Sequence, residues 1–190
     1  MAANSDTLAR ILDGTLSALA RRGVHKLSMS DVGTAAGISR GTLYRYFKSK
    51  DQLLDAIGEH VQRSMQEELR SAVEQRPELS ERVQVVVEAI LYFRQTHPEA
   101  VQVITVEPGF GVDFVRQVFP RFVTVTEELL TPALEQSPAV RSGELTSAEL
   151  SELILRAAAS TFFIPTDDLD EVSRMITALA FLNTAELAAR

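Results

Sequence analysis

The sequence predicts an all-α protein, in which an N-terminal three-helix domain containing a helix-turn-helix is joined by a long helix to a C-terminal helical bundle. Nearly every segment of the 190 residues spaces its apolar side chains three and four apart, as on one face of a helix, and none sustains the alternation of a strand. Cap and breaker residues divide these segments at helical lengths. We expect residues 1–48 to form the first domain and residues 49–190 the second.

The first two helices have clear boundary signals. The first helix begins near Ser5 or Asp6 and ends at Gly23, because a glycine that follows two arginines is a common way to end a helix. Ser28 precedes Asp31 by three residues, which predicts a capping-box start for a short second helix.

Two more helices follow within the next forty or so residues. Gly37 ends the second helix, because glycine readily adopts the left-handed conformation of a tight turn. Ser39 begins a third helix. Ser49, with Gln52 at the third position, predicts a capping box and a long fourth helix, which must end before Pro77.

The remaining chain is typical of a bundle of longer helices. Residues 83–93 are apolar on almost all sides, which predicts deep burial. Pro120 lies inside an apolar run and should start or kink a helix. Thr146 with Glu149 predicts a capped helix that reaches about residue 163, and the last helix begins at residues 166–167.

Charge is distributed unevenly along the chain, whose net charge is −7. Residues 1–60 sum to +2 and residues 61–190 to −9. A basic front and an acidic remainder indicate that only the front meets a polyanion. The alternative is that the charges are scattered at random over solvated faces.

Composition excludes several classes of site and protein. The chain has no cysteine, which excludes disulfides and thiolate metal sites. It has no apolar run of membrane-spanning length, and its first ten residues lack the layout of a signal peptide. We therefore expect a cytoplasmic protein with no membrane partner.

Residues 28–47 carry the most informative pattern in the chain. Two short helices flank Gly37, and their inward positions are apolar: Val32, Ala36, Ile38, Leu43 and Phe47. This arrangement predicts a helix-turn-helix, a unit whose second helix enters the major groove of DNA.

The stretch "SRGTLYRYFKSK", residues 39–50, supplies the chemistry for DNA binding. Arg40 and Thr42 are placed to reach base edges, since arginine pairs with guanine and a threonine methyl contacts thymine. Several other side chains are placed to reach the phosphate backbone with a hydroxyl or a positive charge. These residues are Ser30, Tyr44, Arg45, Tyr46, Lys48 and Lys50, and Lys50 also lies in the first turn of the fourth helix, whose free amides can bind the same phosphate. The alternative is that the tyrosines are half-buried surface residues and the cations form a solvated face.

Here the sequence resembles a known family. "GISRGTLYRYFKSKDQLLDAI" is similar to the signature of the TetR family of bacterial transcription regulators, in which T-x-Y-x-x-F ends the helix-turn-helix and S-K-x-x-L opens a long helix. The resemblance covers residues 8–57, with Gly33 standing where alanine is usual. It implies DNA contacts from the positions occupied by Ser39, Arg40, Gly41, Thr42, Tyr44, Tyr46 and Lys50.

The resemblance also implies a small-molecule pocket and a dimer interface in residues 49–190. Phenylalanines and nearby polar groups are the pocket candidates: Phe93, Arg94, His97, Phe110, Phe114, Phe119, Phe122, Thr161 and Phe162. The last two helices are apolar on more than one side, which requires a second partner. Their interface candidates are Leu155, Ala158, Ala159, Phe163, Val172, Met175, Ile176, Leu179 and Leu182. The alternative for both sets is burial in the chain's own core.

Signals for catalysis are poor, so we do not expect an enzyme or a cofactor. The three histidines lie far apart with no metal-ligand spacing, and no nucleophile motif is present. We interpret the chain as a homodimeric, ligand-responsive transcription regulator that binds a pseudo-palindromic operator on double-stranded DNA. The resemblance implies a repressor, and the phenylalanines between residues 93 and 162 predict that a small, largely apolar effector releases it. The alternative is a helical ligand-binding protein or small enzyme, which would show no salt-sensitive DNA binding.

Overall fold

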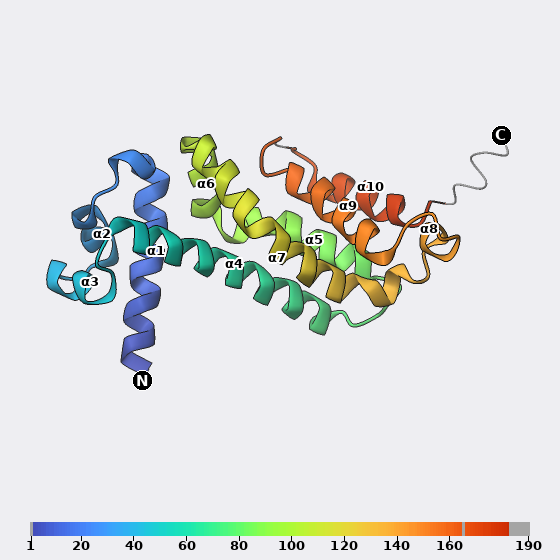
Figure 1. Cartoon of the computed structure of the whole chain (residues 1–190), viewed down its shortest axis with the longest axis horizontal. Helices are drawn as coiled ribbons and strands as arrows, with labels where there is room; N and C mark the ends of the chain where they lie inside the picture. The colour runs from blue at the N-terminus through green and yellow to red at the C-terminus, as the bar shows by residue number, and fades with distance from the viewer. Residues whose placement is uncertain (1, 165, 183–190) are drawn as a thin grey trace. The chain divides into compact units, whose positions relative to one another are not determined.

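The structure, a computed structural model, describes residues 2–164 and 166–182, with side chains from residue 6 onwards. These residues form helices and connecting turns, and no strand occurs among them. The helices are α1 (Ala2–Lys26), α2 (Met29–Ala36), α3 (Arg40–Tyr46), α4 (Lys50–Gln75), α5 (Arg82–Thr96), α6 (Pro98–Val106), α7 (Pro108–Leu134), α8 (Pro138–Arg141), α9 (Ser147–Ser160) and α10 (Leu169–Ala180) (Figure 1). The all-α fold is confirmed.

The chain divides into two compact units. Unit 1 contains the residues up to Ser64 together with His97–Val118, and unit 2 contains Met65–Thr96 and the chain from Phe119 onwards. Helices α4 and α7 therefore each contribute residues to both units. The domain boundary expected after residue 48 falls inside unit 1. The division into a DNA-binding part, residues 1–48, and a second domain, residues 49–190, stays a prediction.

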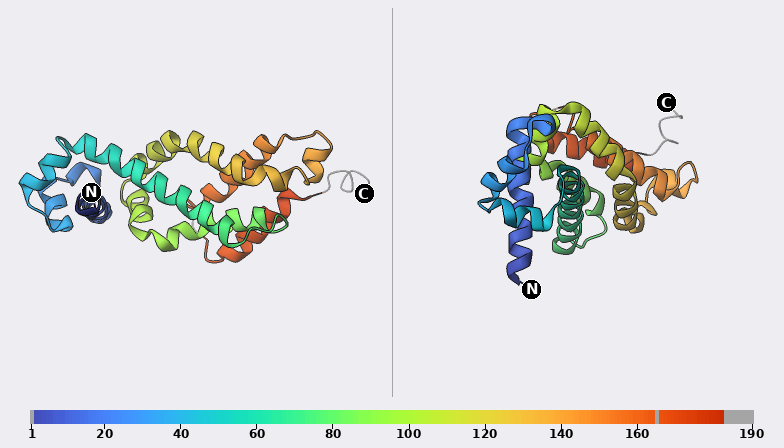
Figure 2. Two further views of the ribbon diagram at one scale, coloured as in Figure 1. Left: turned by 90° about the horizontal axis from the view of Figure 1, so that it is seen from below. Right: turned by 60° about the vertical axis from the view of Figure 1, so that its left-hand side comes forward.

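In unit 1, helix α1 is the element against which α2 and α6 pack. Figures 1 and 2 show α2 and α3 together beside α1. Apolar side chains from these helices and from the start of α4 form the core: Ile11, Leu12, Leu19, Val32, Leu43, Leu53 and Ile57. The backbone of α1 is non-helical at Gly23, as expected, although the helix begins before residue 5 and resumes after the kink to Lys26.

The capping signals of unit 1 are confirmed with one correction. Ser28 Oγ accepts from the Asp31 amide at 3.2 Å, and the Asp31 carboxylate accepts from the Ser28 amide at 3.0 Å. Ser49 Oγ accepts from the Gln52 amide at 3.2 Å. However, the Gln52 side chain accepts from the amide of Lys48, not from that of Ser49, so the predicted capping box is incomplete.

In unit 2, α5 is the buried helix that residues 83–93 predicted. Seven of its side chains are buried: Val83, Val85, Val86, Val87, Ile90, Leu91 and Phe93. It packs against α9 and α10. The buried hydroxyl of Ser137 donates to the carbonyl of Ala180 at 2.6 Å, which ties the segment after α7 to the end of α10.

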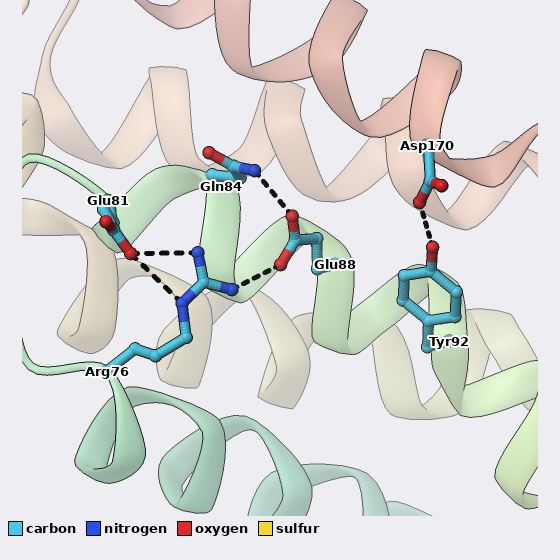
Figure 3. Close-up of polar contacts among 6 residues, drawn as sticks. All are labelled: Arg76, Glu81, Gln84, Glu88, Tyr92 and Asp170. Carbon is cyan, nitrogen blue, oxygen red and sulfur yellow. Dashed lines mark hydrogen bonds and ion pairs between the residues drawn. The ribbon is translucent and has the colours of Figure 1, made fainter.

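Polar contacts join α5 to its neighbours in unit 2 (Figure 3). Arg76, just after α4, donates to Glu81 at 2.9 and 3.1 Å and to Glu88 of α5 at 2.6 Å. The Tyr92 hydroxyl donates to Asp170 in the first turn of α10, and this bond raises the pKa of Tyr92 above its ordinary value. These contacts fix the exposed side of α5 between the end of α4 and the start of α10.

Three helix boundaries differ from those expected in the C-terminal part. Helix α7 runs through Pro120, so no helix starts there, and the kink that was the other expectation for this proline stays a prediction. The Thr146–Glu149 capping box is confirmed, but α9 ends at Ser160. The last helix begins later than predicted, because Asp168 is its N-cap and accepts from the Glu171 amide at 2.7 Å.

Candidate DNA-binding site

Two buried apolar side chains attach helix α3 to the core, and its polar residues lie on the outer side. Leu43 is fully buried and Phe47, at the end of the helix, is buried as well. Arg40, Gly41 and Arg45 are exposed. Thr42, Tyr44 and Tyr46 are half-buried. The helix therefore has the amphipathic form that reading a groove requires: one side is fixed to the core and the other is available to a ligand.

Ser39 fixes the start of this helix. Its hydroxyl accepts from the Thr42 amide at 3.1 Å and lies 2.9 Å from the Thr42 hydroxyl. Ser39 is thus the N-cap of α3, and any contact of its side chain with DNA has to coexist with these bonds. At Gly41 an added Cβ would meet nothing closer than Ser39 Oγ at 3.9 Å, so the surface there is open.

Two arginine–tyrosine stacks order the exposed side of α3. The Arg40 guanidinium carbon lies 5.4 Å from the ring centroid of Tyr44, and that of Arg45 lies 5.7 Å from the centroid of Tyr46. A cation over an aromatic face is attracted by the ring quadrupole, and the N–H donors at the guanidinium edge are not consumed by that contact. Each cation is therefore oriented before any phosphate or base arrives.

The two lysines predicted to contact phosphates differ in their surroundings. The Lys48 ammonium is exposed and donates to the Tyr44 carbonyl at 3.0 Å. The Lys50 ammonium is partly buried and donates to the carbonyls of Val24 and Leu27 at 2.6 and 3.3 Å. Ser30 is exposed in the first turn of α2. Lys50 therefore has a structural role that its sequence position did not reveal.

Two residues of α1 that sequence reasoning missed support the turn between α2 and α3. Arg10 Nη2 donates to the carbonyls of Ala36 and Gly37 at 3.0 and 3.1 Å. One helical turn later, a Cβ on Gly14 would lie 2.6 Å from the backbone nitrogen of Ala36, so only glycine permits this close crossing. Their spacing of four puts both on one side of α1, which is the one signal in the sequence that pairs them.

The start of α2 carries a perturbed carboxyl group. The Ser28 hydroxyl and then the Ser28 amide bond to the Asp31 carboxylate, and Arg22 lies 3.3 Å from it. These contacts hold the pKa of Asp31 below its ordinary value, although partial burial opposes them. A carboxylate at this position also interacts favourably with the positive end of the α2 dipole.

Comparison with known proteins identifies the family that the N-terminal part of the chain resembles. Residues 11–57, which include α2, α3 and the start of α4, match the family model for bacterial regulatory proteins of the tetR family. Residues 11–57 are thus similar to the DNA-binding part of the TetR family. Curated relatives that match the chain include proteins named HTH-type transcriptional regulators.

Curated relatives and solved structures are similar to parts or to most of the chain. The transcriptional regulator YhgD of Bacillus subtilis, described as uncharacterized, is 27% identical over 58% of this chain and 58% of its own. The chain spans about half the length of the curated relatives it matches. Among solved structures, FadR of Bacillus subtilis in complex with stearoyl-CoA has a TM-score of 0.70 at 17% identity, covering 93% of this chain and 98% of its own. FadR of Bacillus halodurans has a TM-score of 0.72 at 18% identity, covering 91% and 93%. At these identities the structures show similarity of the helical fold alone.

The residues predicted to line a ligand pocket are distributed over both units. His97, Phe110 and Phe114 belong to unit 1, where His97 occupies the N-cap position of α6. The others belong to unit 2: Phe93, Arg94, Phe119, Phe122, Thr161 and Phe162. Within unit 2, Arg94 donates to the Thr161 carbonyl at 3.0 Å. Phe93 is buried in the core, and Phe119 lies under the guanidinium of Arg156 at 4.8 Å. The pocket stays a prediction.

The predicted interface residues separate into two groups by exposure. Leu155, Ala158 and Ile176 are buried within the single chain, so they contribute to its core. Ala159 and Val172 are half-buried. Four others are exposed apolar side chains: Phe163, Met175, Leu179 and Leu182. Large apolar side chains outside this set of candidates are also exposed nearby: Leu153, Phe181 and Ile164, the last at 71%.

Two further features of the described residues concern membranes and metal ions. No described helix is both long and apolar enough to cross a membrane. Among the same residues, no group of three or more histidine, aspartate or glutamate side chains is arranged to hold a metal ion.

Proposed function

We propose that this chain is a TetR-family regulator, a homodimeric repressor that grips a pseudo-palindromic operator with the α3 helices of its two copies and is released by a largely apolar effector. The observation that carries the proposal is the form of α3. Buried Leu43 fixes the helix, while Arg40 and Arg45 are held on tyrosine rings at its exposed side. A regulator of this kind acts on the chromosome, so its place is the cytoplasm.

In this proposal, Arg40 and Thr42 read base edges and the surrounding groups fix the register on the phosphate backbone. Arginine at a guanine edge gives bidentate recognition, which phosphate contacts do not. Backbone contacts come from Ser30, Tyr44, Arg45, Tyr46, Lys48 and the start of α4 at Lys50. Ser39 and Gly41 serve mainly to shape the first turn of α3 and to let the backbone of the duplex approach.

A second copy of the chain is the partner proposed for the exposed apolar side of α10. Met175 and Leu179 are one helical turn apart, and Leu182 follows three residues later. Leu153 and Ile164 add exposed apolar surface on and after α9. Exposed apolar side chains on two helices that pack together favour association through this side of the chain. A two-fold dimer also matches the symmetry of a pseudo-palindromic operator.

The effector class follows from the phenylalanines of unit 2 and from the fold analogy. Phe119, Phe122 and Phe162 are half-buried and supply apolar lining, with Arg94 nearby as a cation. The FadR protein of Bacillus subtilis, similar in fold, was solved with stearoyl-CoA. By that analogy, long-chain acyl thioesters are the first effector class to test here.

Release of the operator requires that effector binding favours a state that fits DNA poorly. Helices α4 and α7 have residues in both units, so they are the elements through which such a change would pass. The effector must bind that state more tightly, and by linkage the operator must weaken effector binding by the same factor.

The test is to measure effector affinity with and without operator. Acyl-CoAs of increasing chain length are titrated into the protein by calorimetry, with coenzyme A alone and free fatty acids as controls. We expect affinity to rise with chain length and to fall when saturating operator is present. Equal affinities would show that the ligand is not the signal, and affinity for coenzyme A alone equal to that for the acyl forms would contradict an apolar pocket.

A further inference from the structure

The crossing of α1 over the end of α2 combines a close approach with a specific hydrogen-bonded clamp. Gly14 lets the two backbones meet, since a Cβ there would lie 2.6–2.9 Å from three atoms of Ala36. One turn earlier on α1, Arg10 Nη2 donates to the carbonyls of Ala36 and Gly37. Because of this close crossing, α1 lies near enough to the end of α2 for one guanidinium nitrogen to donate hydrogen bonds to two carbonyls.

These two carbonyls lie at the point where the chain turns from α2 into α3. The amides of Gly37 and Ile38 bond back to Thr34 and Gly33 at 3.2 and 3.0 Å, and Gly37 takes a left-handed conformation with φ 63°. The carbonyls of Ala36 and Gly37 lie beyond the last helical bonds and therefore need a partner outside the helix. A cation at the carboxyl end of α2 also meets the negative end of the helix dipole.

The direction of α3 depends on this turn. Only Ile38 and Ser39 separate Gly37 from the first residue of α3, Arg40. A change of a few degrees in the turn therefore tilts the recognition helix and moves the side chains that meet base edges. Contacts from single charges to phosphate oxygens tolerate such a tilt, whereas bidentate base contacts do not.

We propose that Arg10 is a positioning residue for operator recognition: it clamps the carbonyl end of α2 and so sets the angle at which α3 presents Arg40 to the bases. Its effect is on the preference for operator over other DNA, and not on the general attraction to the duplex. Arg10 thereby acts on specificity from α1, without touching a base itself.

The test compares Arg10→Met with Arg21→Met in the full-length protein. Methionine keeps an apolar stem and removes the donors. Arg21 lies on the same helix and is exposed, and it donates to Ser17 within α1, so its substitution controls for the loss of one positive charge. Affinities are measured by fluorescence anisotropy for an operator selected by the wild-type protein and for a scrambled duplex, at several salt concentrations.

We expect Arg10→Met to lower the ratio of operator to scrambled affinity by on the order of tenfold, while Arg21→Met leaves the ratio unchanged. Arg10→Lys should lie between Arg10→Met and the wild type, because the lysine side chain ends one bond short of the Nη2 position. An unchanged ratio for Arg10→Met would overturn the proposal. The proposal would also be overturned if Arg10→Met lost the same affinity for both duplexes and if the slope of log affinity against log salt concentration fell by about 0.9 more than in Arg21→Met. That result would mark Arg10 as a phosphate contact.

Hydrogen exchange separates a local clamp from general loosening. In free Arg10→Met, we expect faster exchange at the amides of Gly37 and Ile38 and unchanged exchange at the α4 residues 53–61. A uniform increase across unit 1 would overturn the proposal. If Arg10→Met does not fold, Arg10→Lys is compared with Arg21→Lys: a ratio reduced about threefold supports the clamp, and an unchanged ratio overturns it.

Discussion

The ammonium of Lys50 donates to the carbonyl oxygen of Val24 at 2.6 Å and so ties the start of α4 to the end of α1. A second bond, to Leu27 at 3.3 Å, extends the same contact into the segment before α2. An ammonium has three donors, and these two bonds use two of them. Lys50 therefore combines a structural bond with the phosphate contact proposed for it.

Substitution of Lys50 should change both stability and DNA binding. Lys50→Ala is expected to lower the free energy of unfolding by about 1 kcal/mol, because hydrogen bonds from a charged donor to two partly buried carbonyls are lost. It should also weaken binding to all duplexes alike and reduce the salt slope by about 0.9. The ammonium of Lys48 is exposed, so Lys48→Ala should reduce the salt slope of binding without lowering the free energy of unfolding. Urea unfolding together with salt-dependent anisotropy distinguishes the two, and a Lys50→Ala variant as stable as the wild type would contradict the structural role.

Two substitutions at Tyr44 separate its ring from its hydroxyl. Tyr44→Phe keeps the surface on which Arg40 stacks and removes the proposed phosphate contact, so affinity should fall by about 1 kcal/mol on every duplex. Tyr44→Leu also removes the stack and should lower the operator preference further. If the two variants show the same ratio of operator to scrambled affinity, the ring does not orient Arg40.

The crossing at Gly14 predicts a steric effect with a matched control. Gly14→Ala should cost about 1–3 kcal/mol of stability, since its Cβ meets the backbone of Ala36 and not a movable side-chain end. Gly109→Ala in α7 has no atom within 4 Å of the added Cβ and should be neutral or stabilising by up to about 1 kcal/mol. Chemical unfolding of both variants checks this, and equal effects would mean that α1 and α2 do not cross as described.

The capping box of α2 predicts an acid-sensitive contribution to stability. The pKa of Asp31 is below its ordinary value of 3.8, so the carboxylate contributes stability that is fully present above about that pH and is lost as the pH falls through the lowered pKa. Asp31→Asn should therefore be less stable than the wild type at neutral pH, and the difference should shrink below pH 3.8. In a Ser28→Ala background the pH-dependent part should be smaller, because the hydroxyl that bonds the carboxylate is gone. A difference that stays constant from pH 6 down to about pH 3 would contradict this account.

The exposed side of α10 predicts the effect of a charge on assembly. Leu179 is 59% exposed, so Leu179→Glu should leave the fold intact but separate the proposed dimer, because a carboxylate buried between apolar helices is costly. Operator binding should weaken at least about tenfold, since two half-sites are no longer gripped together. Gln95→Glu, an exposed position on α5, controls for the added charge. Sedimentation of Leu179→Glu as a stable dimer would place the interface elsewhere.

The local features of the fold were predictable from the sequence, because capping rules act over three or four residues. Ser28, Ser39 and Thr146 start helices as predicted, and the break at Gly23 is also confirmed. The failures have equally local causes. Asp168 is the N-cap of α10 because its carboxylate accepts from the Glu171 amide. Thr166 and Asp167 are also residue types that cap helices, so composition alone does not identify which of the three is the N-cap.

The long-range contacts were not predictable from one sequence. Arg10 and Ala36 are 26 residues apart, and nothing in the chain signals that α1 crosses the end of α2 at that point. The same holds for Lys50 and Val24. For the candidate interface, helical spacing identified apolar stripes on the last two helices. It did not predict which of these residues are buried in the chain's own core and which are exposed: Ala158 is fully buried, whereas Leu179 is exposed.

The most direct test of the central claim, that α3 reads bases in paired half-sites, is selection of random duplexes by the purified protein in parallel with Arg40→Ala. We expect an enriched motif of two inverted half-sites with centres about 34–36 Å apart or a multiple of that distance. Arg40→Ala should lose about 1–3 kcal/mol on the best site and relax the preference at one base pair in each half-site. No enriched motif, or a motif that is identical for the wild type and Arg40→Ala, would contradict the account.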